Sequence, residues 1–166
     1  EEYWFDQIAT IDDSIFLSGI YTVNNQSDII TAKLNTEGNM MWDSYWGNAY
    51  DDFVNEIAVD ESGIYLLGRT ELVNGDLNVF LIKYGTQGGI IYENTWGGEN
   101  ATAWGYGLAL HYGEAYVCGN FERELNFGDQ ISLKSNGSSD MYVASINEEG
   151  ECTWAENWGG PDSERA

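Results

Sequence analysis

A threefold internal repeat constrains the fold of this chain more than any other feature of its sequence. Each repeat ends in a Trp-Gly pair, and the three tryptophans are Trp46, Trp96 and Trp158. Two glycines recur in the same order upstream of each pair. The aligned glycines are Gly19, Gly68 and Gly119, followed by Gly38, Gly88 and Gly150. A register that holds over the whole chain predicts three copies of one structural unit.

Each repeat contains four short segments that are rich in β-branched and aromatic residues, and many of them alternate apolar with polar side chains. This pattern is typical of β-strands. Turn-forming residues separate the segments, and the sequence shows no capped helical pattern. We expect strands over 4–11, 14–21, 28–34 and 39–46, over 53–60, 63–70, 77–84 and 89–96, and over 104–111, 114–121, 140–146 and 151–158.

Four antiparallel strands in a repeat of about 50 residues are the signature of a β-propeller blade. We therefore expect an all-β fold in which residues 1–166 form a single β-propeller segment of three four-stranded antiparallel blades. The expected blades are 1–47, 48–98 and 99–160, and 161–166 would begin a further repeat. Propellers close into rings of about 4–8 blades. The chain is then either part of a longer propeller or one component of a ring closed by several copies.

The repeats resemble the SBBP family, a β-propeller repeat of bacterial and archaeal cell-surface and secreted proteins. The resemblance lies in residues 57–68 and 80–84, in Gly88 and in 96–98, and in 119–121, 126–128 and 138–144 of the third repeat. The chain departs from the pattern at Asn48, at His111 and at Ser145. The resemblance implies an extracellular or cell-surface module of a larger protein. It implies no shared catalytic residues, so we carry none over.

The charge balance narrows the classes of partner. The 166 residues include 6 Lys and Arg against 28 Asp and Glu, which gives a net charge of −22. Nucleic-acid affinity depends largely on basic side chains, so we expect no nucleic-acid partner. No apolar run approaches the roughly 18–20 residues that a membrane-spanning helix needs, and we expect no membrane insertion.

Pairs of aromatic residues recur four positions apart in the last strand of each repeat. The pairs are Trp42 and Trp46, Tyr92 and Trp96, and Trp154 and Trp158. Residues four apart in a strand point to the same face. Such a row either stacks on sugar rings or packs one blade on the next. We favour blade packing, because the row recurs in every repeat, and Trp4, Phe53 and Trp104 receive the same interpretation.

Carboxylates in predicted turns leave calcium binding open, because Ca²⁺ takes several loop oxygens. The nearest cluster is 74–78, and other acidic turn residues are Asp12, Asp13, Asp51, Asp52, Glu61, Glu148 and Glu149. We assign no metal ligands, no cofactor-binding residues and no catalytic residues. His111 is the only histidine, and the sequence contains no nucleophile motif.

Two further features are specific to the third repeat. Cys118 and Cys152 would lie at opposite ends of strands separated by one strand, so we expect free thiols. The loop 120–139 is unique in the chain and contains 122–124, 127–129 and Lys134. Unique loops on repeat scaffolds often carry binding, so this loop is a candidate contact site.

The sequence leaves three functions open. The first is a non-catalytic extracellular module that binds a protein or a glycan. The second is a structural propeller that self-assembles into a ring or a surface array. The third is an enzyme that acts on polysaccharide with paired carboxylates. We favour the binding module.

Overall fold

The computed structural model describes residues 2–128 and 130–164. Strands make up 69% of the described residues, which contain no helix and hence none that could cross a membrane. The strands are β1 (Glu2–Ile11), β2 (Ser14–Val23), β3 (Gln26–Asn35), β4 (Met40–Trp46), β5 (Asp52–Asp60), β6 (Gly63–Glu71), β7 (Leu77–Tyr84), β8 (Ile90–Trp96), β9 (Thr102–His111), β10 (Glu114–Glu122), β11 (Glu124–Asn126), β12 (Ser132–Lys134), β13 (Asp140–Ile146) and β14 (Cys152–Trp158).

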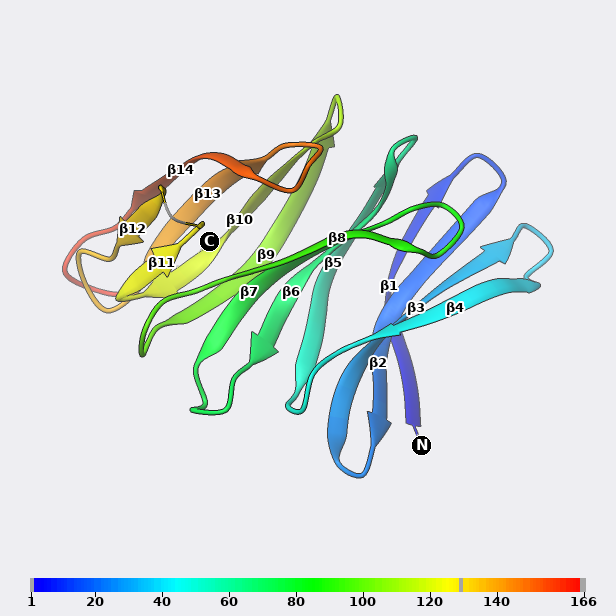
Figure 1. Cartoon of the computed structure of the whole chain (residues 1–166), viewed down its shortest axis with the longest axis horizontal. Helices are drawn as coiled ribbons and strands as arrows, with labels where there is room; N and C mark the ends of the chain where they lie inside the picture. Colours follow the sequence, from blue (N-terminus) through cyan, green and yellow to red (C-terminus); the bar gives the residue numbers. More distant parts are fainter. Residues whose placement is uncertain (1, 129, 165–166) are drawn as a thin grey trace.

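The strands form three antiparallel four-stranded units, in each of which a strand pairs with the next (Figure 1). The first unit is β1–β4, the second is β5–β8, and the third is β9, β10, β13 and β14. A single parallel pair, Leu77 with Thr102, joins the second and third units into one eight-stranded sheet. Every expected strand is present, with ends within two residues of those expected.

The sequence did not predict the hairpin of β11 and β12, which lies inside the segment that we expected to be a loop. Leu125 and Leu133 face each other across this hairpin, and both are buried. Asn126 bridges back to Gly97, where its backbone N–H donates to the Gly97 carbonyl at 3.0 Å. Three-residue strands are too short for an alternating pattern to identify them, so only their packing distinguishes them from a loop.

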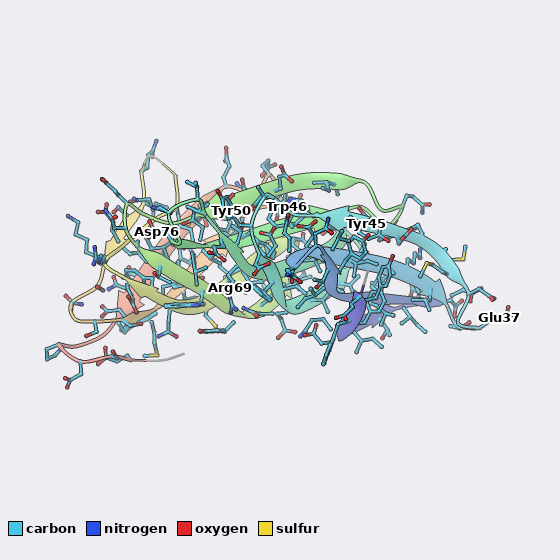
Figure 2. The ribbon with its side chains drawn as sticks, turned by 90° about the horizontal axis from the view of Figure 1, so that it is seen from below. Glu37, Tyr45, Trp46, Tyr50, Arg69 and Asp76 are labelled. Carbon is cyan, nitrogen blue, oxygen red and sulfur yellow. The ribbon has the colours of Figure 1, made fainter. Side chains whose placement is uncertain are left out.

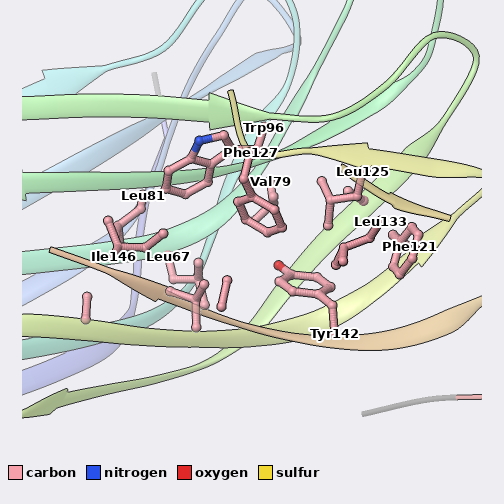
Figure 3. Packing of buried hydrophobic residues seen from close by; sticks show 14 of the residues in the cluster. Leu67, Val79, Leu81, Trp96, Phe121, Leu125, Phe127, Leu133, Tyr142 and Ile146 are labelled. Atoms are coloured by element: carbon pink, nitrogen blue, oxygen red, sulfur yellow. The ribbon is translucent and has the colours of Figure 1, made fainter. Parts of the chain in front are cut away.

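Two apolar layers hold the units together. One layer lies between the first and second units and includes Phe16, Leu66 and Phe80. The other lies between the second unit, the third unit and the hairpin, and includes Leu67 and Tyr142 (Figure 3). Because neighbouring strand residues point to opposite faces, Leu66 and Leu67 serve different layers. The second unit is therefore buried on both of its faces.

In each unit, the first of the two recurring glycines lies opposite a register shift in the first strand. These glycines are Gly19, Gly68 and Gly119. Pairing shifts between Phe5 and Gln7 in β1 and between Val54 and Glu56 in β5. A side chain at Gly19 would collide with the Trp4 carbonyl, and one at Gly119 would collide with the Trp104 carbonyl. The repeat thus preserves a place where two backbones approach too closely for a Cβ atom.

Candidate functional site

The recurring aromatic residues hold one unit against the next. Trp42 lies over the turn between β7 and β8, where its indole Nε1 donates to the Thr86 carbonyl at 3.2 Å. A methyl group added to Gly88, which has a φ of +87°, would lie 2.9 Å from the Trp42 ring. Tyr92 repeats this contact on the third unit, because a methyl group on Gly150 would lie 2.9 Å from its ring. The predicted packing is thus confirmed for Trp42 and Tyr92, whereas Trp4, for which we expected the same packing, is 71% exposed.

The second aromatic of the first two pairs also packs across an interface. The Trp46 ring lies 4.8 Å from that of Phe80, and its Nε1 donates to Glu93 Oε2 at 2.6 Å. Trp96 is 7% exposed and packs against Phe127, with ring centroids 5.3 Å apart. These four aromatic side chains are structural, which excludes them as a row of sugar-stacking platforms.

The third pair differs, because Trp154 and Trp158 are 43% and 53% exposed. They lie on a face of the third unit that points away from the second unit. We call it the third-unit far face; its members are Tyr116, Cys118, Met141, Val143, Trp154 and Trp158. The adjacent residues on the opposite face, such as Val117 and Ala144, are buried. In the second unit, the positions equivalent to Cys118, Val143 and Trp158 are occupied by Leu67, Leu81 and Trp96. All three of these residues of the second unit are buried.

A second apolar face is exposed at the other end of the chain. Tyr45 and Trp46 are neighbours in β4 and point to opposite sides, Trp46 toward the second unit (Figure 2). We call the side of Tyr45 the first-unit outer face; its members are Tyr3, Phe5, Ile8, Ile15, Leu17, Tyr21 and Tyr45. Ile8 is 65% exposed, whereas Ile57, at the equivalent position of the second unit, is buried.

Sequence reasoning did not single out the first-unit outer face. The signal was present, because Ile8, Ile15 and Leu17 align with Ile57, Ile64 and Leu66 of the second repeat. Those three residues of the second repeat are buried against the first unit. Aligning the repeats and asking which unit covers each apolar position would have identified this face.

The carboxylates in the predicted turns, where the sequence left calcium binding open, are dispersed. No group of three or more His, Cys, Asp or Glu residues that could hold a metal ion occurs in 2–128 or 130–164. In the 74–78 turn, Asn74 Nδ2 donates to Asp76 Oδ2 at 2.6 Å. Asp51 Oδ1 accepts from the Ser27 backbone N–H at 2.8 Å, and Asp60 Oδ1 accepts from that of Ser62 at 2.8 Å. These carboxylates stabilise turns.

Two buried aspartates, Asp52 and Asp140, hold the loops that lie directly before β5 and before β13. Asp52 Oδ2 accepts from the Asn48 backbone N–H at 2.8 Å. Asp140 Oδ2 accepts from the Asn136 backbone N–H at 3.0 Å. Burial raises the pKa of Asp52 above its usual range, because it disfavours the charged form.

The raised pKa of Asp52 makes the folded protein bind a proton more tightly than the unfolded chain does. Its stabilising contribution is complete below the unfolded-state pKa and is lost as pH rises through the folded-state pKa. We expect the free energy of unfolding of the wild type to rise relative to that of Asp52→Asn as pH falls from 7 to about 4. Urea unfolding at a series of pH values measures this difference. A difference that is constant, or that moves in favour of the variant, contradicts the assignment.

Cys118 and Cys152 are both free, as expected. They pair with Val143 and Ile146 of the intervening strand β13, so they are separated by a strand. Burial raises the pKa of Cys152 to about 11, which makes its thiol a poor nucleophile at neutral pH. His111 is the last residue of β9, and its ring packs against Tyr112 with centroids 4.3 Å apart.

The unique loop of the third repeat builds a groove with strands from two units. The groove is lined by residues of β8, of the hairpin and of β14, among them Asn94, Trp96, Phe127, Gln130, Ile131 and Thr153. Of the charged residues singled out in this loop, Glu124 accepts from the Ser132 hydroxyl at 3.0 Å. Asp129 lies outside the described residues. The hairpin thus adds a surface that the other two units lack.

No family model matches the chain, and no curated protein matches it.

Proposed function

We propose that this chain is a three-blade segment of a β-propeller that acts as a non-catalytic module and assembles through its two end faces. The resemblance to SBBP repeats adds an extracellular or cell-surface location to the proposal. The strand order supports the propeller architecture, because each unit is a meander of four antiparallel strands. The first strands of the three units are also neighbours in chain order, because β1 contacts β5 and β5 contacts β9 (Figure 1).

The observation that carries the proposal is the exposure of two faces whose equivalents are buried inside the same molecule. Trp158 stands where the second unit has buried Trp96, and Ile8 stands where it has buried Ile57. Contiguous exposed apolar surface of this kind marks an interaction site. A further four-stranded unit would cover either face. The two equivalent faces of the second unit are already covered in this way, one by the first unit and the other by the third unit.

A tandem chain tests whether the two faces fit each other. In this variant one copy ends at Asp162 and continues directly into Glu1 of a second copy. The next tryptophan of a Trp-Gly pair then follows Trp158 after 50 residues, the spacing between Trp46 and Trp96. We expect a compact species of about twice 18.6 kDa whose thermal midpoint exceeds that of the single chain. Tryptophan emission shifts to shorter wavelength as Trp154 and Trp158 become buried.

The matched control is the same tandem chain with Trp154→Glu in both copies, which places a charge on each far face. We expect this control to keep the midpoint of the single chain. A wild-type tandem that melts with the single chain and shows no emission shift would overturn the proposal.

The hairpin groove favours a second candidate function, the binding of a protein or a glycan. Its lining places the side-chain amides of Asn94 and Gln130 and the hydroxyl of Thr153 beside the apolar side chain of Ile131. A few polar groups on an apolar lining can bind the hydroxyls of a sugar and cover its apolar face. Calorimetric titration with a panel of neutral hexasaccharides tests the glycan arm. Binding that Gln130→Ala weakens and Val73→Ala leaves unchanged supports it, and no binding to any member rejects it.

A further inference from the structure

We infer that a second copy of this chain docks head to tail, with its first-unit outer face on the third-unit far face and its Gly38 beneath Trp154. This inference rests on the proposed function, because it names the partner of the two end faces. Three independent features of the chain support it: the aromatic-on-glycine contact, the contact of the second tryptophan, and the complementary sizes of facing residues.

The contact of an aromatic ring with a turn glycine occurs twice within the chain. One further aromatic residue, in the third unit, and one further turn glycine, in the first unit, have no such contact among the described residues. Trp42 lies over Gly88, and Tyr92 lies over Gly150. Trp154 is the third aromatic of this series and is exposed. Gly38 is the remaining glycine of the series, with a φ of +82°, and no atom of the described chain lies within 4 Å of the position of a methyl group added there.

The residues that precede Gly38 match those that precede Gly88. Trp42 Nε1 donates to the carbonyl of Thr86, two residues before Gly88. Thr36 stands in the same place before Gly38. Docking in the same register would place the Trp154 indole N–H at the Thr36 carbonyl.

The second tryptophan gives a further match. Trp46 Nε1 donates to Glu93 of the second unit. In the docked pair the equivalent residues are Trp158 and Asp43. Asp43 is an exposed carboxylate that accepts from the Tyr45 hydroxyl at 2.9 Å on the first-unit outer face. The pair therefore keeps an indole donor opposite a carboxylate.

The sizes of facing residues are also complementary. At the interface of the second and third units, large Leu67 faces Gly105, where an added methyl group would lie 2.6 Å from Leu67 Cγ. In the docked pair, small Cys118 takes the position of Leu67, and large Phe5 takes the position of Gly105. The exchange of large and small residues conserves the filled volume, as close packing requires.

The native mass of the 166-residue chain tests the inference. Each copy carries a net charge of −22, so the measurement is made at about 0.15 M salt, where repulsion between exposed charges is screened beyond about 8 Å. We expect light scattering to show a concentration-dependent rise from 18.6 kDa to twice that mass or more. Trp154→Glu should weaken association by about 30-fold or more. Tyr112→Glu, which makes the same kind of change at a 90% exposed aromatic, should leave association unchanged.

Two glycines provide a matched pair of variants that tests the first-unit outer face. Gly38 and Gly75 share a φ of +82°, and neither has a described atom near an added methyl group. Alanine therefore brings the same backbone strain at both positions. Only Gly38→Ala should abolish association, because its methyl group would meet the docked Trp154 ring.

Mixing the two deficient variants distinguishes head-to-tail docking from symmetric docking. Trp154→Glu keeps an intact first-unit outer face, and Gly38→Ala keeps an intact third-unit far face. We expect the mixture to form a one-to-one complex, although each variant alone stays monomeric. If either variant alone associates like the wild type, the inference is wrong.

The tandem chain separates this inference from the proposed function. A wild-type chain that stays at 18.6 kDa even at millimolar concentration overturns the second copy as the partner. If the tandem chain nevertheless shows the raised midpoint, the end faces still fit each other and the proposed function stands. If both experiments fail, both proposals fall.

Discussion

Replacing Phe80 with alanine should lower the free energy of unfolding by about 3–5 kcal/mol. Phe80 is fully buried in the layer between the first and second units, where its ring packs 4.8 Å from that of Trp46. It also fills the space above Gly68, since a methyl group there would lie 2.6 Å from Phe80 Cζ. Truncation removes the ring and leaves a cavity between two rigid sheets, which cannot easily close around it. Urea unfolding followed by circular dichroism measures the loss.

Tyr112→Ala provides the control, because this aromatic ring is 90% exposed and its loss should change stability by less than about 0.5 kcal/mol. The stability of a typical domain is only about 5–15 kcal/mol, so the Phe80 variant should also show a clear drop in thermal midpoint. A loss below about 1 kcal/mol would contradict the view that this layer holds the first unit to the second.

The repeat made most of the fold predictable. A strand that recurs three times in one register is identified by three independent samples of the same pattern, which explains why the expected strand ends lie within two residues of those found. The aromatic packing was predictable for the same reason: Trp42 and Tyr92 recur because each meets a turn glycine of the next unit. Recurrence therefore revealed the contacts that the units share.

Recurrence could not reveal what is unique or what depends on tertiary context. The hairpin of β11 and β12 occurs once, and its burial against Trp96 and Tyr142 follows from packing. The burial of Asp52 and Asp140 was equally hidden, because an acidic residue beside a turn is usually solvated. The first-unit outer face was overlooked because an apolar strand residue such as Ile8 is ordinarily taken to be buried. Only the arrangement of the units shows that Ile8 lies on a face that the described chain leaves exposed.

Asp140→Ala should destabilise the chain by about 3 kcal/mol, a large effect for a single polar side chain. Asp140 is fully buried, and its Oδ2 accepts from the Asn136 backbone N–H at 3.0 Å, from Asn136 Nδ2 at 3.1 Å and from Asn157 Nδ2 at 3.0 Å. Alanine would leave these donors without their acceptor, and unsatisfied buried donors are costly. Thermal and urea unfolding give the difference from the wild type.

Asp76→Ala is the matched control, since Asp76 also accepts from an asparagine amide, at 2.6 Å, but in an exposed turn. It should cost less than about 0.5 kcal/mol, because water replaces the lost acceptor. Asp140→Asn separates the oxygen acceptor from the charge. The second unit has Asn78 at the equivalent position, against Gly97 as Asp140 lies against Gly159. We therefore expect the asparagine variant to retain most of the stability that alanine loses. If asparagine is as damaging as alanine, the negative charge is what the loop requires, and the two units have different chemistry at this shared position.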